Sequence, residues 1–379
     1  MKLTCQKLTS LLSELRQQKR VFDATINVGD LDKAKGMQLE IEDKVAILHE
    51  EIWDFPELPL VELKKDYVSQ TRILERSGLL RSLESIPGKI GIRGLNGREY
   101  TYPEFSDVKK QIARNRDILR PKMQQGFTKL QITPFGCSVA WMISALSTVI
   151  VRHCEEGKIF APKNNPSDPN EQLVALEVNT SDPVWAADPS RTYRFDETGE
   201  MVYFPENFEA KEHGGKTKKQ ILSKRGGVFS GFIVSLIESD IDIPGGGERK
   251  MVGDRLKFDS YEHPERYLDL IKSLPQYAHE HGLTLEEWIT QFIIHLEETN
   301  QVIDDWQGNG RVCCNLGSYY TESREVSCAA WHRGFRRVEL DRVLRRETNF
   351  KSGTRTAVRI DQPKPKTSVF KRILNRVTK

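Results

Sequence analysis

The feature that most constrains the fold is the alternation of charged and apolar residues between positions 337 and 341. Val338 and Leu340 alternate with Arg337, Glu339 and Asp341. Successive side chains of a strand point to opposite faces, so this spacing predicts a β-strand with one apolar and one charged face. We therefore expect a strand scaffold whose core residues include Val338, Leu340, Ala357 and Val358.

Helices are predicted elsewhere by apolar residues at helical spacing and by capping residues. Apolar stripes over residues 3–24 and 31–53 predict an αα-hairpin. Ser138 caps an apolar helix that runs to about Cys154, and Thr284–Glu287 is a capping box that opens a helix to about Ile303. The same signals predict helices over 62–85 and 106–119. Turn residues and strand-like composition predict a hairpin at Asn96–Gly97, a strand over 127–132, and short strands with long loops over 160–255. This mixture predicts an α+β protein.

The charge of the chain is unevenly placed. The 379 residues contain 57 Lys and Arg and 54 Asp and Glu, a net charge of +3. Residues 311–379 contain 17 basic and 6 acidic residues, whereas residues 1–310 have a net charge of −8. This asymmetry predicts either a basic surface that meets an acidic partner or internal neutralisation between the two parts, and both remain open.

Cysteine usage and hydropathy indicate a compartment. None of the six cysteines forms a CxxC pair, and the adjacent Cys313 and Cys314 are too close for a usual zinc knuckle. The first residues lack the apolar segment of a signal peptide. The longest apolar run, residues 138–154, is shorter than the roughly 20 residues that a membrane helix needs. We therefore expect a cytoplasmic protein with free thiols.

Three short motifs could carry chemistry, and each has a plainer interpretation. His213–Thr217 is similar to the end of a phosphate-binding loop, but position 210 is Ala where that motif needs Gly. His279 and His281 could bind a metal, but no third ligand lies nearby in the sequence. Four carboxylates near a helix end could bind calcium or pair with arginines: Glu297, Glu298, Asp304 and Asp305. We predict no catalytic residue, no metal and no cofactor.

The arginine-rich segment near the C-terminus is the strongest anomaly. The segment contains the apolar residues Trp331, Phe335 and Leu344. Its six arginines are Arg333, Arg336, Arg337, Arg342, Arg345 and Arg346. Arginine combined with aromatic residues is typical of nucleic-acid binding and of protein interfaces. A third, purely structural interpretation pairs these arginines with carboxylates of the acidic part of the chain.

The same segment resembles the end of a C-type-lectin-like domain of the formylglycine-generating-enzyme type, and more narrowly the variable proteins of diversity-generating retroelements. The matching pieces are Leu316–Tyr319, Ala330–Trp331, Arg336, Leu340 and Gly353–Ile360, within "LGSYYTESREVSCAAWHRGFRRVELDRV" and "GTRTAVRI". The resemblance implies a lectin-like fold, in this case short strands with two helices preceded by the helical hairpin. It also implies a binding surface that a reverse-transcriptase system diversifies at adenines, and it implies binding rather than catalysis.

This resemblance implies a set of ligand-binding residues. Adenine mutation of an Asn codon that ends in C cannot produce Trp, Glu or Lys, so Trp331, Glu339, Glu347 and Lys351 are expected to be scaffold. Arg336 and Arg342 are expected to be structural arginines. The residues expected to bind the ligand are Ala330, His332, Arg333, Gly334, Phe335, Arg337, Asp341, Val343, Leu344, Arg345, Arg346 and Asn349.

The predicted organisation has four parts. They are a helical hairpin over 1–54, a connecting region over 55–125, a lectin-like ligand-binding domain over 126–361 and a basic tail over 362–379. The expected ligand is a protein or another macromolecule. The hairpin could mediate oligomerisation, and the tail could bind an anionic partner or dock on the acidic part of the chain.

Two other functions are compatible with the sequence. One is a formylglycine-generating-type oxidase, for which Cys313, Cys314 and Cys328 are the clustered candidates. The other is a nucleic-acid-binding module that uses the arginine-rich segment and the tail.

Overall fold

The computed structural model describes residues 59–164, 170–186, 195–224, 227–348 and 351–361, together with residues 14, 17–25, 37, 38 and 41. The helical hairpin predicted over 1–54 lies largely outside the described residues. The basic tail predicted over 362–379 lies entirely outside them.

Helices and several sheets together make the described chain an α+β protein, as the sequence predicts. One sheet has four antiparallel strands in the order β12-β18-β9-β4. Their bounds are β4 Lys129–Thr133, β9 Ile233–Ile237, β12 His281–Gly282 and β18 Thr356–Arg359. The two neighbours of β9 come from opposite ends of residues 126–361, so this sheet joins the beginning and the end of that region.

The larger sheet contains the arginine-rich segment. It follows the order β17-β14-β15-β16-β7, and β13 and β8 pair with β15 and β14. The bounds are β7 Val184–Ala186, β8 Met201–Tyr203, β13 Asp305–Trp306, β14 Val312–Tyr320, β15 Glu325–His332, β16 Arg337–Leu344 and β17 Ser352–Gly353. Val338 and Leu340 of β16 are buried and Asp341 is exposed, which confirms the predicted alternation.

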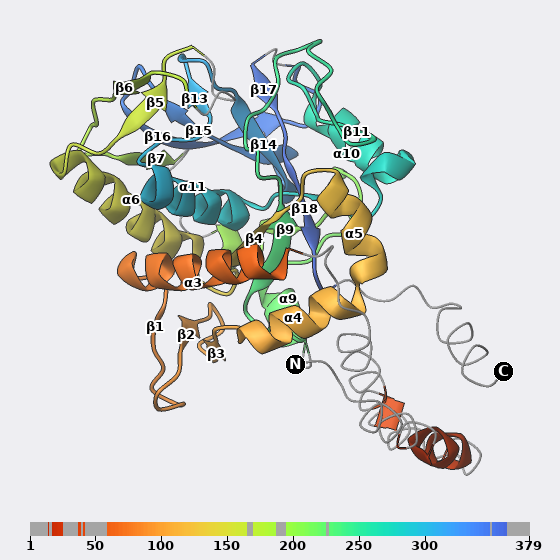
Figure 1. The fold of residues 1–379 in the computed structure, drawn as a ribbon. Helices are drawn as coiled ribbons and strands as arrows, with labels where there is room; N and C mark the ends of the chain where they lie inside the picture. The colour runs from red at the N-terminus through yellow and green to blue at the C-terminus, as the bar shows by residue number, and fades with distance from the viewer. Residues whose placement is uncertain are drawn as a thin grey trace.

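Three long helices pack against these sheets (Figure 1). They are α3 Leu60–Arg76, α6 Val139–Glu155 and α11 Leu285–Thr299. The predicted caps are confirmed, because Ser138 accepts a hydrogen bond from the Trp141 N–H and Thr284 forms a capping box with Glu287. Helix α11 contacts α3 and α6 and also β4, β14 and β15, so it lies between the two sheets. This central position explains why α11 is buried on nearly all sides.

Residues 60–125 share the same hydrophobic core. Leu63 and Leu74 of α3 belong to one cluster with Leu130 of β4 and Val358 of β18. Gln70 holds α3 against β4, since its side chain donates to the Leu130 carbonyl and accepts from the Ile132 N–H. Along the chain, α3 and β4 are separated by β1 Arg81–Ser82, β2 Ile90–Arg93, β3 Glu99–Thr101, α4 Phe105–Arg114 and α5 Arg116–Gln124. The hairpin predicted at Asn96–Gly97 is confirmed by the antiparallel pair β2–β3.

The region over 126–361 has more helices than the two that were predicted. Besides α6 and α11 it contains α8 Phe195–Thr198, α9 Lys218–Ser223 and α10 Pro264–Ser273, with a 3-10 turn η1 Pro275–Tyr277. The sequence does carry a signal for α10, because Pro264 occupies the first turn and Tyr267, Leu268 and Ile271 are buried on one side. The remaining short strands are β5 Phe160–Pro162, β6 Leu173–Ala175, β10 Met251–Val252 and β11 Arg255–Leu256.

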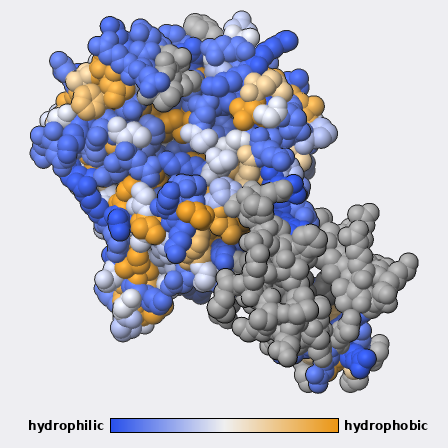
Figure 2. Space-filling view, in the orientation of Figure 1, coloured by the Kyte–Doolittle hydropathy of each residue, from blue (hydrophilic) through white to orange (hydrophobic). Residues whose placement is uncertain are grey.

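The surface has the character expected from the composition. On the face in Figure 2, hydrophilic residues dominate and hydrophobic residues form small separate groups. Among the described residues, no helix combines the length and the apolar character needed to cross a membrane.

Candidate functional site

The predicted ligand-binding residues lie at the two ends of the β15–β16 hairpin. His332, Arg333, Gly334, Phe335 and Arg337 surround the turn between the strands. Leu344, Arg345 and Arg346 lie at the other end of β16. Strand β16 spans seven residue steps from Arg337 to Leu344, which corresponds to roughly 23 Å at about 3.3 Å per residue. The structure therefore divides the predicted set into two separate surfaces.

The surface at the turn is built from aromatic rings in contact with one another. We call it the tip surface and define it by Trp185, Trp306, His332, Arg333, Phe335 and Arg337. The His332 ring lies between Phe335 and Trp306, with centroid distances of 4.1 Å and 4.4 Å. The Phe335 side chain is 57% exposed. Arg337 lies over both Phe335 and Trp185, 5.4 Å from each ring centroid. These contacts form a preorganised surface of aromatic rings and arginine that reaches solvent at Phe335.

His332 is the centre of this surface and is itself buried, with 3% exposure. Its Nδ1 accepts a hydrogen bond from the Phe335 N–H at 3.1 Å, which fixes the turn. Burial lowers the pKa of His332 and favours the neutral imidazole, the form in which a ring nitrogen can accept this bond. His332 therefore positions Phe335.

Carboxylates from other segments hold the arginines of the tip. Arg333 Nε lies 3.2 Å and 3.1 Å from the two carboxylate oxygens of Asp305. Arg337 donates to Asp182, and Arg336 lies 2.9 Å from Glu177. The contact of Arg333 with both oxygens of Asp305 restricts the rotamers of its guanidinium group, whereas Arg336 and Arg337 each make a single contact with their carboxylate.

The surface at the other end of β16, which we call the far-end patch, consists of Leu344, Arg345 and Arg346. Leu344 is 52% exposed. Arg345 bonds to Glu209 at 2.7 Å and to the Phe208 carbonyl at 2.5 Å. Arg346 bonds to Glu265 of α10 at 2.5 Å. In contrast to the tip surface, no ring contact or cation–π contact involving its three residues is found in the described part of the chain.

The other predicted residues do not extend either surface. Ala330 is buried, so its methyl group does not reach solvent. Asp341 is exposed in the middle of β16, and Val343 packs at the edge of a second apolar cluster. Asn349 lies outside the described residues. Trp331, expected to be scaffold, is fully buried.

Sequence reasoning missed the residues that complete the tip surface. Trp185 comes from β7 and Trp306 from β13, and both strands pair with the hairpin in parallel. The parallel pairing aligns Trp306 with His332 although 26 positions separate them. In the sequence Trp306 is an isolated tryptophan within a polar stretch, and this stretch does not indicate the strand with which Trp306 pairs.

All six arginines of the C-terminal segment are ion-paired within the protein. The pairs are Arg333–Asp305, Arg336–Glu177, Arg337–Asp182, Arg342–Glu325, Arg345–Glu209 and Arg346–Glu265. Five of these pairs join the C-terminal part to residues 1–310 and the sixth lies within the C-terminal part, so for this segment the pairs favour the internal neutralisation that the charge asymmetry left open. It reduces the positive charge available to phosphates and disfavours a nucleic-acid surface formed by these arginines.

The clustered cysteines lie in the interior of the large sheet. Cys314 and Cys328 are directly paired across β14 and β15. Burial raises the pKa of the Cys313 thiol to about 12 and also raises those of Cys314 and Cys328. Reactive cysteines usually have a lowered pKa in a partly exposed, electropositive site. The three thiols therefore lack the environment that a thiolate-based oxidase site requires.

The geometry defines an α+β protein with an exposed aromatic and arginine surface at the end of a long hairpin. Comparisons of the chain with protein-family models, with curated proteins and with solved structures found no match. The functional assignment therefore depends on the tip surface itself.

Proposed function

We propose that the protein recognises a protein ligand through the tip surface, which a lectin-like scaffold presents. The observation that carries this proposal is the contact array of Trp306, His332 and Phe335, with Arg337 against Phe335 and Trp185. Aromatic residues and arginine dominate the binding energy of protein interfaces.

Preorganisation makes the tip surface suited to this role. Phe335 is exposed but held by the His332 ring and by the hydrogen bond to its N–H. Arg333 and Arg337 are held by Asp305 and Asp182. Side chains that are already ordered lose less conformational entropy on binding, so more of the contact energy remains as affinity. The far-end patch also contains ion-paired arginines, but it lacks the ring contacts of the tip surface.

The strand arrangement supports the lectin-like part of the proposal. Strands β4 and β18 flank β9, so the two ends of residues 126–361 meet in one sheet. The long strands β14, β15 and β16 form the second sheet, with α6 and α11 as the longest helices of this region. The resemblance of residues 316–360 to variable proteins of diversity-generating retroelements indicates the same fold.

That resemblance also leads us to propose that the surface is diversified. Phe335 and Gly334 are exposed in the turn, whereas Val338 and Leu340 hold β16 on the buried face. Substitution of exposed residues usually changes stability by less than about 0.5 kcal/mol. Sequencing the DNA around the coding region tests this proposal. We expect a near-copy of the segment that encodes 327–360, differing mainly at adenines and close to a reverse-transcriptase gene; a neighbourhood without such a copy contradicts it.

Affinity capture tests the binding function. The intact protein and its Phe335→Ala and Leu344→Ala variants are immobilised and exposed to an extract of the source organism, and retained proteins are quantified by mass spectrometry. Phe335 and Leu344 are exposed to similar extents, 57% and 52%, so Leu344→Ala is a matched control. We expect a ligand that Phe335→Ala retains at least about tenfold less, equivalent to about 1.4 kcal/mol, and that Leu344→Ala retains normally. Equal retention by all three proteins, or no retained protein, contradicts the proposal.

A further inference from the structure

A cavity lies apart from the tip surface, between β8, β12 and β18. Its volume is about 380 Å³, within the range of about 300–1,000 Å³ that is typical of small-molecule sites. The cavity is lined by Tyr203, Phe204, Gly214, Lys216, His279, Glu280, His281 and Arg359. None of these residues belongs to the tip surface. Figure 1 shows β13, which borders the tip, well apart from β18, which borders the cavity.

Two cavity residues have a left-handed backbone conformation that residues other than glycine rarely adopt. Phe204 has φ 53° and His279 has φ 69°, and neither is glycine. Such conformations cost about 1–3 kcal/mol each and concentrate at ligand and active sites. The Phe204 N–H donates to the Gly317 carbonyl at 3.0 Å, which helps to hold the strained residue in place.

A buried carboxylate orients the histidine of the cavity. His281 Nε2 lies 3.0 Å and 3.3 Å from the two carboxylate oxygens of Glu287, which is fully buried. Burial raises the pKa of Glu287, but the charge and hydrogen bond of His281 and the Thr284 N–H outweigh it, so the net shift is downward. An ionised carboxylate only accepts hydrogen bonds, so Nε2 carries the hydrogen. To contact an anion, Nδ1 of the same ring must also carry a hydrogen, and the adjacent Glu287 carboxylate compensates the charge of the resulting imidazolium.

Positive groups complete the lining. Arg359 lies 5.5 Å from the centroid of the Phe204 ring, and the His281 ring lies 5.3 Å from it. Lys216 contributes an exposed ammonium group. The hydrogen bond and charge of Lys216 lower the pKa of the neighbouring Lys224. An anion close to both lysines reduces the repulsion between them.

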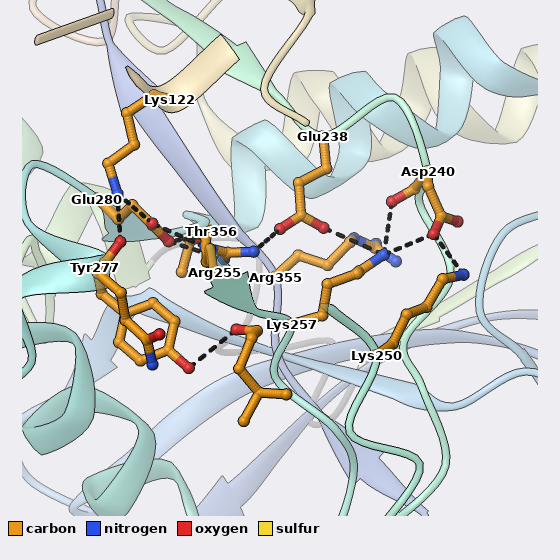
Figure 3. A network of polar contacts seen from close by, with 12 residues as sticks. Lys122, Glu238, Asp240, Lys250, Arg255, Lys257, Tyr277, Glu280, Arg355 and Thr356 are labelled. Carbon is orange, nitrogen blue, oxygen red and sulfur yellow. Dashed lines mark hydrogen bonds and ion pairs between the residues drawn. The ribbon is translucent and has the colours of Figure 1, made fainter. Parts of the chain in front are cut away.

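Glu280 does not cancel this positive charge in the cavity. Figure 3 shows its carboxylate directed toward Lys122 and Arg255. The contacts are 2.6 Å to Lys122 and 2.8 Å to each of two Arg255 nitrogens, and the Glu280 side chain is fully covered. The network continues through Glu238 to Lys257, so the charge of Glu280 is compensated within the protein. Arg359 is paired with Asp361 at 2.9 Å and His281 with Glu287 at 3.0 Å, so the positive charge that the lining offers to a ligand comes mainly from the exposed Lys216.

We propose that this cavity binds a small organic anion whose carboxylate or phosphate group contacts Lys216 and His281 and whose apolar part packs on Phe204. The site is independent of the tip surface, and it provides the protein with a second, small-molecule ligand. The oxyanion supplies a counter-charge for Lys216, and the Phe204 ring supplies a flat apolar contact.

Calorimetric titration of the intact protein with benzoate, phenyl phosphate, inorganic phosphate and benzamide tests the proposal. We expect benzoate or phenyl phosphate to bind, and benzamide, which has the ring but no charge, to bind at least tenfold more weakly. If inorganic phosphate binds as tightly as phenyl phosphate, the apolar contact with Phe204 is wrong. If neither organic anion binds, or if benzamide binds equally well, the proposal is overturned.

Variants locate the site. Lys216→Ala and His281→Gln are each expected to weaken binding of the better probe at least fivefold, and Lys216→Arg is expected to restore most of it. Lys211→Ala, an exposed lysine that does not line the cavity, is the matched control. Melting temperatures confirm that each variant is folded. Equal weakening by Lys216→Ala and Lys211→Ala indicates nonspecific charge attraction and contradicts the proposed site, whereas unchanged binding by Phe335→Ala is expected because the tip surface takes no part.

Discussion

Asp304 and Arg355 form a two-point ion pair in the interior, with N–O distances of 2.7 Å and 2.6 Å. Both side chains are only 3% exposed. The Trp288 indole donates to the same carboxylate at 2.7 Å, so the pair also ties α11 to the segment before β13. Burial lowers the pKa of Arg355, but the charge of Asp304 outweighs this effect and the net shift is upward. The pair thus joins helix α11 to Arg355, the residue directly before β18.

Removal of one partner should strongly destabilise the protein. Arg355→Met leaves the Asp304 carboxylate buried without its counter-charge, and we expect a loss of about 3–5 kcal/mol in the free energy of unfolding. Urea denaturation measures this change. Arg346→Ala is the matched control, because Arg346 is exposed and its pair with Glu265 should contribute less than about 1 kcal/mol. Similar losses for both variants would show that the buried pair has no special structural role.

Substitutions at the tip should separate positioning residues from contact residues. His332 is buried between two rings, so we expect His332→Ala to destabilise the protein by about 1–3 kcal/mol. Phe335→Ala should change stability by less than about 1 kcal/mol, since that side chain is largely exposed. Thermal or urea unfolding of the two variants checks the difference. A freely tolerated His332→Ala contradicts the positioning role and supports the simpler expectation that this position varies without cost.

Much of the local structure could be predicted because its signals lie within a few residues. The capping box at Thr284–Glu287, the Ser138 cap and the alternation around Val338 each depend on neighbours in the sequence. The core positions Val338, Leu340, Ala357 and Val358 were predicted from the same patterns and are all buried. The helix from Thr284 ends at Thr299 rather than near Ile303, because Asn300 adopts a left-handed conformation that terminates it.

The candidate site could be predicted only in part because its partners are distant in the sequence. Asp182 reaches Arg337 across 155 positions and Glu209 reaches Arg345 across 136. No periodicity relates these residues. The buried Lys218 is a similar case, since it follows the phosphate-loop-like motif but pairs with Asp196 and Glu286 in the interior. Strand register and the paths of the loops determine which distant residues form ion pairs, and local sequence patterns do not predict either of them.

The stability of the protein should fall in mild acid because of His295. Burial, together with the charges of Lys129 and Arg355, lowers the pKa of His295 to about 3, whereas an unfolded chain has a value of about 6.5. As the pH falls below 6.5, the unfolded state binds the proton and the folded state does not, so unfolding becomes more favourable until about pH 3. We expect this group to contribute a loss of about 1–2 kcal/mol between pH 7 and pH 5. Denaturation of His295→Gln at both pH values should show a correspondingly smaller loss; an identical loss contradicts the assignment.

Thiol labelling distinguishes the binding function from the oxidase alternative. Cys314 and Cys328 are buried with raised pKa values, whereas Cys154 is partly exposed. In the native protein at pH 8 we expect iodoacetamide to modify Cys154 and to leave Cys314 and Cys328 unmodified until the protein is unfolded. Peptide mapping by mass spectrometry reads the extent at each position. Rapid native-state labelling of Cys314 or Cys328 favours a reactive thiol site and the oxidase alternative.

Site-specific photocrosslinking tests the central claim, that the tip surface contacts a protein ligand, most directly. The photoreactive amino acid p-benzoylphenylalanine replaces Phe335 in one protein and Leu344 in another, two positions with similar exposure at opposite ends of β16. Each protein is irradiated in an extract of the source organism, and the adducts are identified by mass spectrometry. We predict a dominant protein adduct from position 335 that position 344 does not form, and competition by the wild-type protein should remove it. The same adducts from both positions, or an adduct only from position 344, contradict the claim.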